Sequence, residues 1–408
     1  MKSLAELLDQ LQAAVRAGDR AQALDLARQI QQRLVTESHE QAAIERQMRE
    51  LLAELEKPAI HPDWEPEDLW NAERTVGFAI QEALVYPVWF GTNRQPNGQG
   101  GFGAQRHSQT TLGKAEVWVP QAHRLGEIGT PFWKKLLRLD LSDDTLRLQK
   151  VTTQERNGWL GEIQQAMQVA KADGAKPHAV FFLHGFNVSF EEAAIRAAQI
   201  GVDLAVPGAT AFFSWPSRAS VAAYPADEAT IEASEGAITD FLVDFAAHCG
   251  AEKLHVIAHS MGNRGLLRAL QRIAANAQTR GKVKFGQVFL AAPDVDRDLF
   301  LNLAQLYPDH AERTTLYASG ADLPVHLSSK LHDAPRAGYF PPYTVAPGID
   351  TVAVPNFDLD LLGHSYFAQA EALLTHMRDL MLNGKATETR NQLIPDFDKD
   401  SGFWKLKK

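Results

Sequence analysis

The sequence predicts an α/β fold, in which a mostly parallel sheet is flanked by helices and preceded by an N-terminal helical extension. From residue 178 onward, short apolar runs alternate with amphipathic helical stretches. One apolar run, 254–258, passes through a sharp turn at Ser260 directly into a helical pattern. Residues 1–57 are nearly all helix formers and contain no proline. Strands joined by helices run parallel, because each helix returns the chain to the starting edge of the sheet.

Residues 1–57 carry apolar stripes at helical spacing. Leu4, Leu7, Leu8 and Leu11 share one face, and a second stripe runs from Ile44 to Leu55. Short helices are marginal alone, so these faces must be buried against something. Two readings stay open: a helical hairpin packed on the rest of the chain, or a module that binds a protein partner or self-associates.

The remaining elements follow in order after a linker at 58–84. Residues 84–89 and 115–120 have β-like texture. The alternating part predicts strands at 180–183, 210–215, 254–258, 288–292, 314–318 and 351–354. Helices are expected at 189–205, 226–248, 262–278, 297–306, 322–332 and 365–383. Together 85–384 form one α/β domain, and 385–408 are expected to be a polar, loosely packed tail.

Composition narrows the classes of function. The chain has 408 residues, 45% of them hydrophobic, which is enough for a sizeable core, and a net charge of −9. This charge argues against nucleic-acid binding, which needs a basic face. A single cysteine, Cys249, rules out an internal disulfide. The sequence has no signal-peptide pattern and no apolar run near the roughly 18 residues of a membrane span. We therefore expect a cytoplasmic protein with no transmembrane segment.

Ser260 is the strongest chemical candidate. It stands between an apolar strand and a helix, with the small residues Ala258 and Gly262 two positions to either side. This is the G-x-S-x-G elbow pattern with alanine in place of the first glycine. Such an elbow exposes the serine hydroxyl at the end of a sheet, where a base can reach it.

A serine hydroxyl becomes nucleophilic when a base takes its proton, and an acid must orient that base. His364 follows the last expected strand and precedes the last helix, so we expect it to be the base. Asp322 follows the strand at 314–318 and is favoured as the acid. Asp294, after the preceding strand, is the alternative.

An oxyanion hole needs two backbone N–H groups aimed at the developing charge. Met261, directly after the nucleophile, is expected to supply one. The segment His184-Gly185-Phe186-Asn187 ends another expected strand, and Phe186 is expected to supply the second, with Asn187 the next choice.

Several segments together resemble a bacterial branch of the α/β-hydrolase superfamily, an esterase/lipase-like family of unknown function. They are His-Gly-Phe-Asn-Val-Ser-Phe-Glu-Glu-Ala, Phe-Ser-Trp-Pro-Ser, Ala-His-Ser-Met-Gly-Asn-Arg, Ala-Ala-Pro-Asp and Gly-His-Ser-Tyr. The resemblance covers about residues 85–383, and Trp89-Phe90-Gly91-Thr92-Asn93-Arg94 also fits it. It implies the α/β-hydrolase fold and a serine-hydrolase triad, carried here by Ser260, Asp322 and His364. It does not supply a substrate.

The expected function is therefore hydrolysis of a small-molecule carboxylic ester, or a related acyl bond, through an acyl-enzyme. No cofactor and no metal are expected. The alternative is an interaction or signalling protein, in which the N-terminal helices recruit a partner to a gated or inactive hydrolase fold. The segment 217–229, with Tyr224, is suited to cover the site. Gly98-x-Gly100-x-x-Gly103 matches a dinucleotide fingerprint, but no apolar helix follows it, and we expect a loop.

Overall fold

The computed structural model describes Gln10 and residues 84–120, 146–219, 223–320, 323–354, 367–384, 393–398 and 401–406. The chain divides into two compact units, Met1–Thr75 and Val76–Lys408, and the following concerns the second unit. Apart from the helical Gln10, the expected N-terminal helices lie outside the described residues, as does almost all of the linker.

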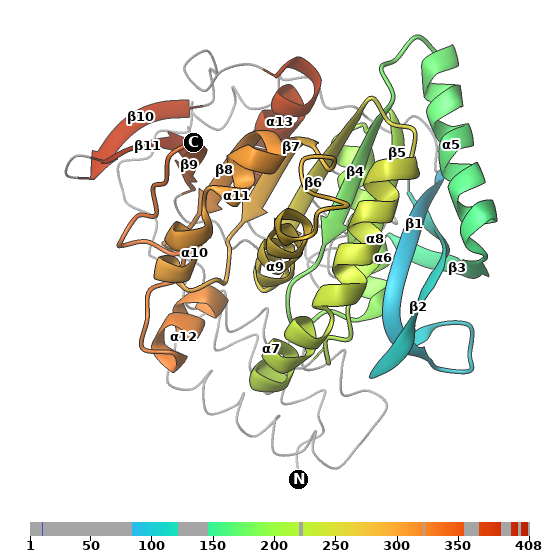
Figure 1. The fold of residues 1–408 in the computed structure, drawn as a ribbon, viewed down its shortest axis with the longest axis horizontal. Coiled ribbons are helices and arrows are strands. Elements are labelled where there is room, and N and C mark those ends of the chain that lie inside the picture. Colours follow the sequence, from blue (N-terminus) through green and yellow to red (C-terminus); the bar gives the residue numbers. More distant parts are fainter. Residues whose placement is uncertain are drawn as a thin grey trace. The chain divides into compact units, whose positions relative to one another are not determined.

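A single twisted sheet organises this unit (Figure 1). Within the described residues it has eleven strands in the order β10-β11-β9-β8-β7-β6-β4-β5-β1-β2-β3. The strands are β1 (Leu84–Pro96), β2 (Phe102–Val119), β3 (Arg147–Gln154), β4 (His178–Leu183), β5 (Gly208–Ser214), β6 (Lys253–His259), β7 (Phe285–Ala291), β8 (Ala311–Ala318), β9 (Ile349–Ala353), β10 (Leu393–Asp398) and β11 (Ser401–Leu406). The expected mostly parallel sheet is confirmed, because the strands from β11 to β1 in this order pair in parallel. Antiparallel pairs close both ends.

Helices cover both faces of the sheet (Figure 1). They are α5 (Arg156–Ala172), α6 (Phe190–Asp203), α7 (Tyr224–Ala233), α8 (Glu235–His248), α9 (Gly262–Ala275), α10 (Arg297–Leu303), α11 (Leu306–His310), α12 (Leu323–Leu331) and α13 (Phe367–Asn383). The central strand β4 reads His-Ala-Val-Phe-Phe-Leu and is buried throughout. Its side chains alternate: Phe181 joins the core under α5, α8 and α9, whereas Phe182 joins the core under α6 and α13. Burial on both faces explains why the strands are continuous apolar runs.

The connections around β4 create the place for a site. The chain leaves β4 through α6 to its neighbour β5, then crosses back through α7 and α8 to β6 on the other side of β4. At such a reversal the loops after the two strands diverge and leave a crevice at their carboxyl ends. The loop after β4 and the turn after β6 are the two segments that hold Phe186 and Ser260.

The structure corrects one expected helix. Residues 226–248 form two helices rather than one, because the chain breaks at Ser234, whose hydroxyl donates back to the Thr230 carbonyl oxygen. Residues 147–172, left without assignment by the pattern, form β3 and α5. Trp159, Ile163 and Met167 bury the inner face of α5.

The expectation of a loosely packed C-terminal tail is wrong for residues 393–398 and 401–406. They form the β10–β11 hairpin, and β11 pairs with β9. Leu393, Phe403 and Leu406 are buried. A short stretch in which apolar and polar residues alternate is a weak sequence signal for a strand. β11 pairs here because β9 would otherwise leave an unpaired edge.

The Gly98-x-Gly100-x-x-Gly103 segment forms the turn between β1 and β2. Gly98 and Gly100 have φ of 75° and 85°, which favours glycine. The Asn97 side-chain oxygen accepts hydrogen bonds from the amides of Gln99 and Gly101. The segment is a hairpin connection, and the glycines serve the turn.

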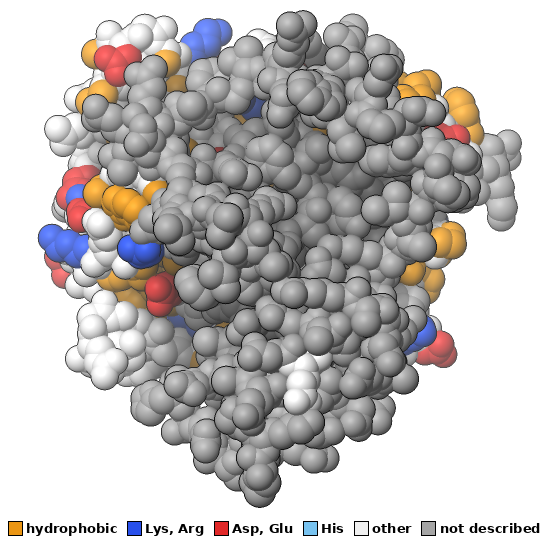
Figure 2. Space-filling view, turned by 180° about the vertical axis from the view of Figure 1, so that it is seen from behind, with side chains coloured by type: hydrophobic (Ala, Val, Ile, Leu, Met, Phe, Trp, Pro, Cys, Tyr) orange, Lys and Arg blue, Asp and Glu red, His pale blue; other side chains and the backbone are white. Residues whose placement is uncertain are grey.

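Along the visible edges of the described part, hydrophobic side chains stand beside lysine, arginine and acidic side chains (Figure 2). None of the helices in the described part has the length and apolar character that a bilayer crossing requires. The described residues also contain no cluster of three or more His, Cys, Asp or Glu side chains arranged to hold a metal ion.

Candidate active site

Ser260 stands at the sharp turn between β6 and α9, and its backbone adopts φ of 49°. A positive φ is rare for a residue other than glycine and costs about 1–3 kcal/mol. Such strain persists where the surroundings impose it, and it concentrates at functional sites. The turn is therefore the strained elbow that the sequence predicts. Ser260 is 5% exposed.

Two glycines permit the close approach of the neighbouring loop to this turn. A Cβ atom on Gly262 would lie 2.6 Å from the carbonyl oxygens of Leu183 and His184. A Cβ atom on Gly185 would lie 2.9 Å from the Ser260 Cβ atom. Both distances are below any ordinary contact, so a side chain at either position would push the loop after β4 away from the serine.

Asn263, which is fully buried, ties the elbow together. Its Nδ2 donates to the carbonyl oxygens of Ala258 and Ser260, both at 3.0 Å. The Ser260 carbonyl oxygen also accepts from the Asp294 amide at 3.2 Å, and the Ser260 amide donates to the Ala291 carbonyl oxygen at 2.9 Å. These bonds couple the elbow to the end of β7 and hold the strained residue in place.

The loop after β4 begins at His184, which is buried and stacked on Trp215 with ring centroids 5.1 Å apart. Its Nδ1 lies 2.7 Å from the Gly185 carbonyl oxygen, an acceptor, so Nδ1 carries the proton. Burial, aided by the charge of Arg94, lowers the pKa of His184 to about 3. A neutral imidazole enclosed in this way does not serve as a general base near pH 7.

The two expected oxyanion donors lie on either side of the Gly185–Ser260 contact. Met261 is buried and caps the N-terminus of α9. Phe186 is half-buried and packs edge-on against Tyr224, with centroids 5.2 Å apart. The Asn187 amide, by contrast, donates to Asp227 Oδ2 at 3.3 Å. Among the described residues, the amides of Phe186 and Met261 have no hydrogen-bond acceptor, whereas the Asn187 amide is bonded to Asp227.

Asp294, the alternative acid, is almost fully buried and surrounded by donors. The Tyr224 hydroxyl donates to its Oδ2 at 2.5 Å, and the Ser328 hydroxyl donates to its Oδ1 at 2.6 Å. The guanidinium groups of Arg264 and Arg336 lie 3.5 and 3.6 Å from Oδ1. This group of five side chains, the Asp294 hub, links α7, α9 and α12. Within the described part of the chain, none of its donors is a histidine.

The Asp294 hub changes the acidity of its tyrosine. Burial, reinforced by the Asp294 charge, raises the pKa of Tyr224 above its ordinary value. The phenol therefore stays protonated at neutral pH and remains a donor to the carboxylate. Tyr224 belongs to the segment expected to cover the site, and it contacts Phe186 on one side and Asp294 on the other.

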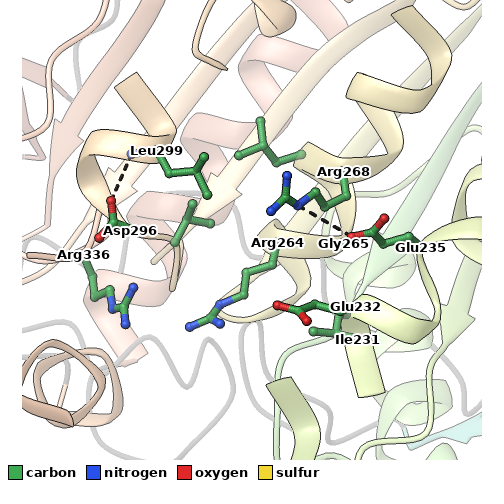
Figure 3. Close-up of a pocket in the computed structure, with 11 residues that line it drawn as sticks. Ile231, Glu232, Glu235, Arg264, Gly265, Arg268, Asp296, Leu299 and Arg336 are labelled. Atoms are coloured by element: carbon green, nitrogen blue, oxygen red, sulfur yellow. Dashed lines mark hydrogen bonds and ion pairs between the residues drawn. The ribbon is translucent and has the colours of Figure 1, made fainter. Parts of the chain in front are cut away.

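A pocket of about 90 Å³ lies beside the hub, between α9, α10 and the junction of α7 with α8 (Figure 3). Its charged lining side chains come in equal numbers of each sign, namely Arg264, Arg268, Arg336, Glu232, Glu235 and Asp296. Arg268 pairs with Glu235 at 3.6 Å. The formal charges of these lining side chains therefore sum to zero.

Of the residues singled out by sequence, Ser260, Met261 and Phe186 are brought together where the loop after β4 meets the turn after β6. Asp322 and His364 lie outside the described residues. The sequence did not single out three residues that hold the site together, namely Asp227, Arg94 and Asn263. Arg94 closes the quoted segment Trp89-Phe90-Gly91-Thr92-Asn93-Arg94, so that segment was its only signal. Asp227 had none, because a single aspartate near a helix start has the appearance of an N-terminal solvated charge.

Comparison with known families assigns the chain. A family model described as "Alpha/beta hydrolase of unknown function (DUF900)" matches residues 162–381, which is more than half of the protein. The chain therefore belongs to this family of α/β hydrolases, as the motifs and the fold indicate. No curated protein matches.

Two solved structures are similar to parts of the chain. One is an uncharacterized protein from Bacillus cereus ATCC 10987, with 14% identity and a TM-score of 0.34, covering 52% of this chain and 61% of that one. The other is a protein from Agrobacterium vitis S4 described as a "putative hydrolase", with 13% identity and a TM-score of 0.32, covering 74% of this chain and 97% of that one. This chain thus spans about three fifths of the Bacillus protein. With identities of 13–14% and TM-scores of 0.32–0.34, neither structure indicates the chemistry of this chain.

Proposed function

We propose that the protein is a serine hydrolase that cleaves a carboxylic ester, or a closely related acyl bond, through an acyl-enzyme on Ser260. The observation that carries this proposal is the strained Ser260 backbone, with φ of 49°, at the strand-to-helix turn. Glycine at this position would relieve the strain and stabilise the fold by about 1 kcal/mol. A serine here is therefore expected where its hydroxyl has a chemical role. The close approach of Gly185 adds support, because it brings a second loop within reach of the same reacting atom.

The proposed base is His364 and the proposed acid is Asp322, both from their position in the chain after β9 and β8. The Asp294 hub supports the choice of acid. Both carboxylate oxygens of Asp294 already accept strong hydrogen bonds, from Tyr224 and Ser328. An imidazole N–H would have to compete with these two hydroxyls and with the guanidinium groups of Arg264 and Arg336 near Oδ1. Asp294 is better suited to hold α7 and α12 next to the elbow.

The oxyanion would be stabilised by the amides of Met261 and Phe186. Two features support this assignment. Met261 directly follows the nucleophile at the N-terminus of α9, where the helix dipole favours negative charge. The next amide of the loop, that of Asn187, is already bonded to Asp227.

In the proposed reaction, His364 removes the Ser260 proton as the hydroxyl oxygen attacks the acyl carbon. The negative charge of the tetrahedral intermediate falls on the carbonyl oxygen, held by the two amides. Asp322 fixes the histidine tautomer and stabilises the imidazolium. His364 then protonates the departing alcohol, and a water activated by the same histidine releases the acid from Ser260. Thioesters and amides follow the same steps.

The test is covalent labelling together with turnover. A fluorophosphonate should attach to Ser260 and to no other serine, and short-chain p-nitrophenyl esters should be hydrolysed. Ser260→Ala should abolish both, with an unchanged circular dichroism spectrum. Ser108→Ala, at an exposed position of β2, is the matched control and should behave as wild type. Undiminished turnover in Ser260→Ala would overturn the proposal.

A further inference from the structure

The loop 184–188 is fixed at almost every residue by groups outside it. The His184 carbonyl oxygen accepts from Trp215 Nε1 at 2.8 Å. The Val188 amide donates to Ser217 Oγ at 3.1 Å, and its carbonyl oxygen accepts from Arg94 Nη2 at 2.7 Å. A loop held this firmly can aim the one amide in its middle, that of Phe186, at a fixed point.

Asp227, on the first turns of α7, is the centre of these contacts and is fully buried. Its Oδ2 accepts from the Ser217 hydroxyl at 2.6 Å and from the Asn187 amide at 3.3 Å. Its Oδ1 accepts from the Arg218 amide at 2.9 Å. Asn187 itself has φ of 57°, so the carboxylate holds a residue whose backbone is strained.

We propose that Asp227 and Ser217 are positioning residues of the oxyanion hole, which hold the loop 184–188 so that the Phe186 amide points at the developing oxyanion. This inference rests on the proposed function. Asp227 holds the loop through the Asn187 amide. The Ser217 hydroxyl donates to the same carboxylate and accepts from the Val188 amide. Neither side chain touches the substrate.

The chemistry at this point requires a carboxylate. All three donors to Asp227 need an acceptor, and an amide side chain has a single acceptor oxygen and two N–H donors of its own. Asp227→Asn would therefore face an N–H group toward a backbone amide or a hydroxyl. The Arg94 guanidinium attracts the Asp227 carboxylate and compensates its buried charge. Arg94 Nη1 also donates to the Ser217 carbonyl oxygen at 2.9 Å.

Helix α7 connects the loop 184–188 with the Asp294 hub, because Asp227 contacts the loop. The same helix begins at Tyr224, whose hydroxyl is bonded to Asp294. A displacement of α7 would therefore break contacts of both the loop 184–188 and the Asp294 hub.

The test compares Asp227→Asn and Ser217→Ala with Asp203→Asn in the full-length protein. Asp203 is the control because it is also buried, bonded to Gln199 at 3.0 Å, but lies at the end of α6. Each positioning variant should lower kcat by about 10²-fold, comparable to the loss of one oxyanion donor, while KM changes less than about threefold. The Ki of a trifluoromethyl ketone, which forms the tetrahedral adduct, should rise by the same factor as kcat falls. Asp203→Asn should keep kcat within about twofold.

Two further measurements separate positioning from general destabilisation. Hydrogen exchange at residues 186–188 should accelerate in Asp227→Asn and remain at the wild-type rate in Asp203→Asn. The double variant of Asp227 and Ser217 should lose little more activity than the worse single variant, because both act on one network. Ser217→Ala decides the matter alone should Asp227→Asn fail to fold.

The two proposals fail in different ways. If the wild-type protein neither hydrolyses esters nor reacts with the fluorophosphonate, the hydrolase proposal is overturned and the positioning roles fall with it. If Ser260→Ala is inactive while folded Asp227→Asn and Ser217→Ala both keep kcat within about threefold of wild type, the positioning roles alone are overturned.

Discussion

Two buried histidines at opposite ends of the central strands show how the same burial serves different purposes. His184 follows the end of β4, beside Ser260, and stacks on Trp215. His255 lies near the start of β6, where its Nδ1 accepts from the Gln287 amide at 3.0 Å and its Nε2 lies 3.2 Å from His178 Nδ1. Burial lowers the pKa of both His184 and His255 to about 3.

The comparison teaches that a depressed histidine pKa does not by itself mark a catalytic base. Both imidazoles are neutral for the same reason, removal from water. Of the two, only His184 belongs to a loop that reaches the nucleophile, and there its Nδ1 donates to the Gly185 carbonyl oxygen while its Nε2 lies 3.4 Å from Ser214 Oγ. A general base for Ser260 has to be exposed enough to titrate near neutral pH, which is the role we assign to His364.

The largest effect should come from His364→Ala. If it is the base, kcat/KM should fall by roughly 10⁴-fold or more, with little change in melting temperature. Ester hydrolysis by the purified variant checks this. Turnover of His364→Ala within tenfold of wild type would remove His364 from the mechanism.

The choice of acid gives the next effect. Asp322→Asn should lower kcat by roughly 10³- to 10⁴-fold, because the histidine would lose its orienting charge. Asp294→Asn should lower kcat by less than about tenfold and reduce stability instead, since Tyr224 and Ser328 would lose part of their acceptor. Kinetics and thermal unfolding of the two variants, measured side by side, decide it. The reverse order would make Asp294 the acid.

The two buried histidines themselves predict a split between activity and stability. His184→Gln should lower kcat by about 10- to 100-fold, because the loop that carries the Phe186 amide loses its stacked anchor. His255→Gln should keep kcat within about twofold. Both variants should lower the melting temperature. Equal kcat values in the two variants would mean that His184 has no special relation to the site.

The smallest effect concerns stability and pH. In the unfolded chain a histidine has a pKa near 6.5, whereas His184 and His255 titrate at about 3 when folded. Between these values the unfolded state binds the extra protons. The free energy of unfolding should therefore fall as the pH drops below about 6.5, by up to about 1.4 kcal/mol per pH unit for each histidine.

Urea titrations at pH 7.0 and 5.5 measure this dependence. Each single glutamine variant should show a slope smaller by about one histidine's share, and no contribution is expected above pH 7. An undiminished slope in His255→Gln would mean that this imidazole is protonated in the folded protein.

Much of the fold was readable from the residues. The six predicted strands from β4 to β9 are confirmed, because apolar runs bounded by turns and separated by helical patterns have few alternatives. Ser260 was identifiable for the same reason, since strand, small residues and helix occur in sequence. The edges were not readable: the β10–β11 hairpin and β3 depend on pairing with distant strands, which no local pattern encodes.

By itself, then, the sequence determined the α/β architecture, the elbow serine and the candidates for the oxyanion donors, because each depends on neighbours close along the chain. Tertiary structure decided the environment of those groups. Gly185 meets Ser260 across 75 positions of sequence, and Asp227 meets Asn187 across 40 positions. The first contact arises because β4 and β6 are neighbours in the sheet, and the second because α7 lies next to the loop after β4. Hydrogen bonds between segments so far apart depend on how the chain packs, so only the packed molecule reveals which buried aspartate contacts the loop 184–188 and which links the helices.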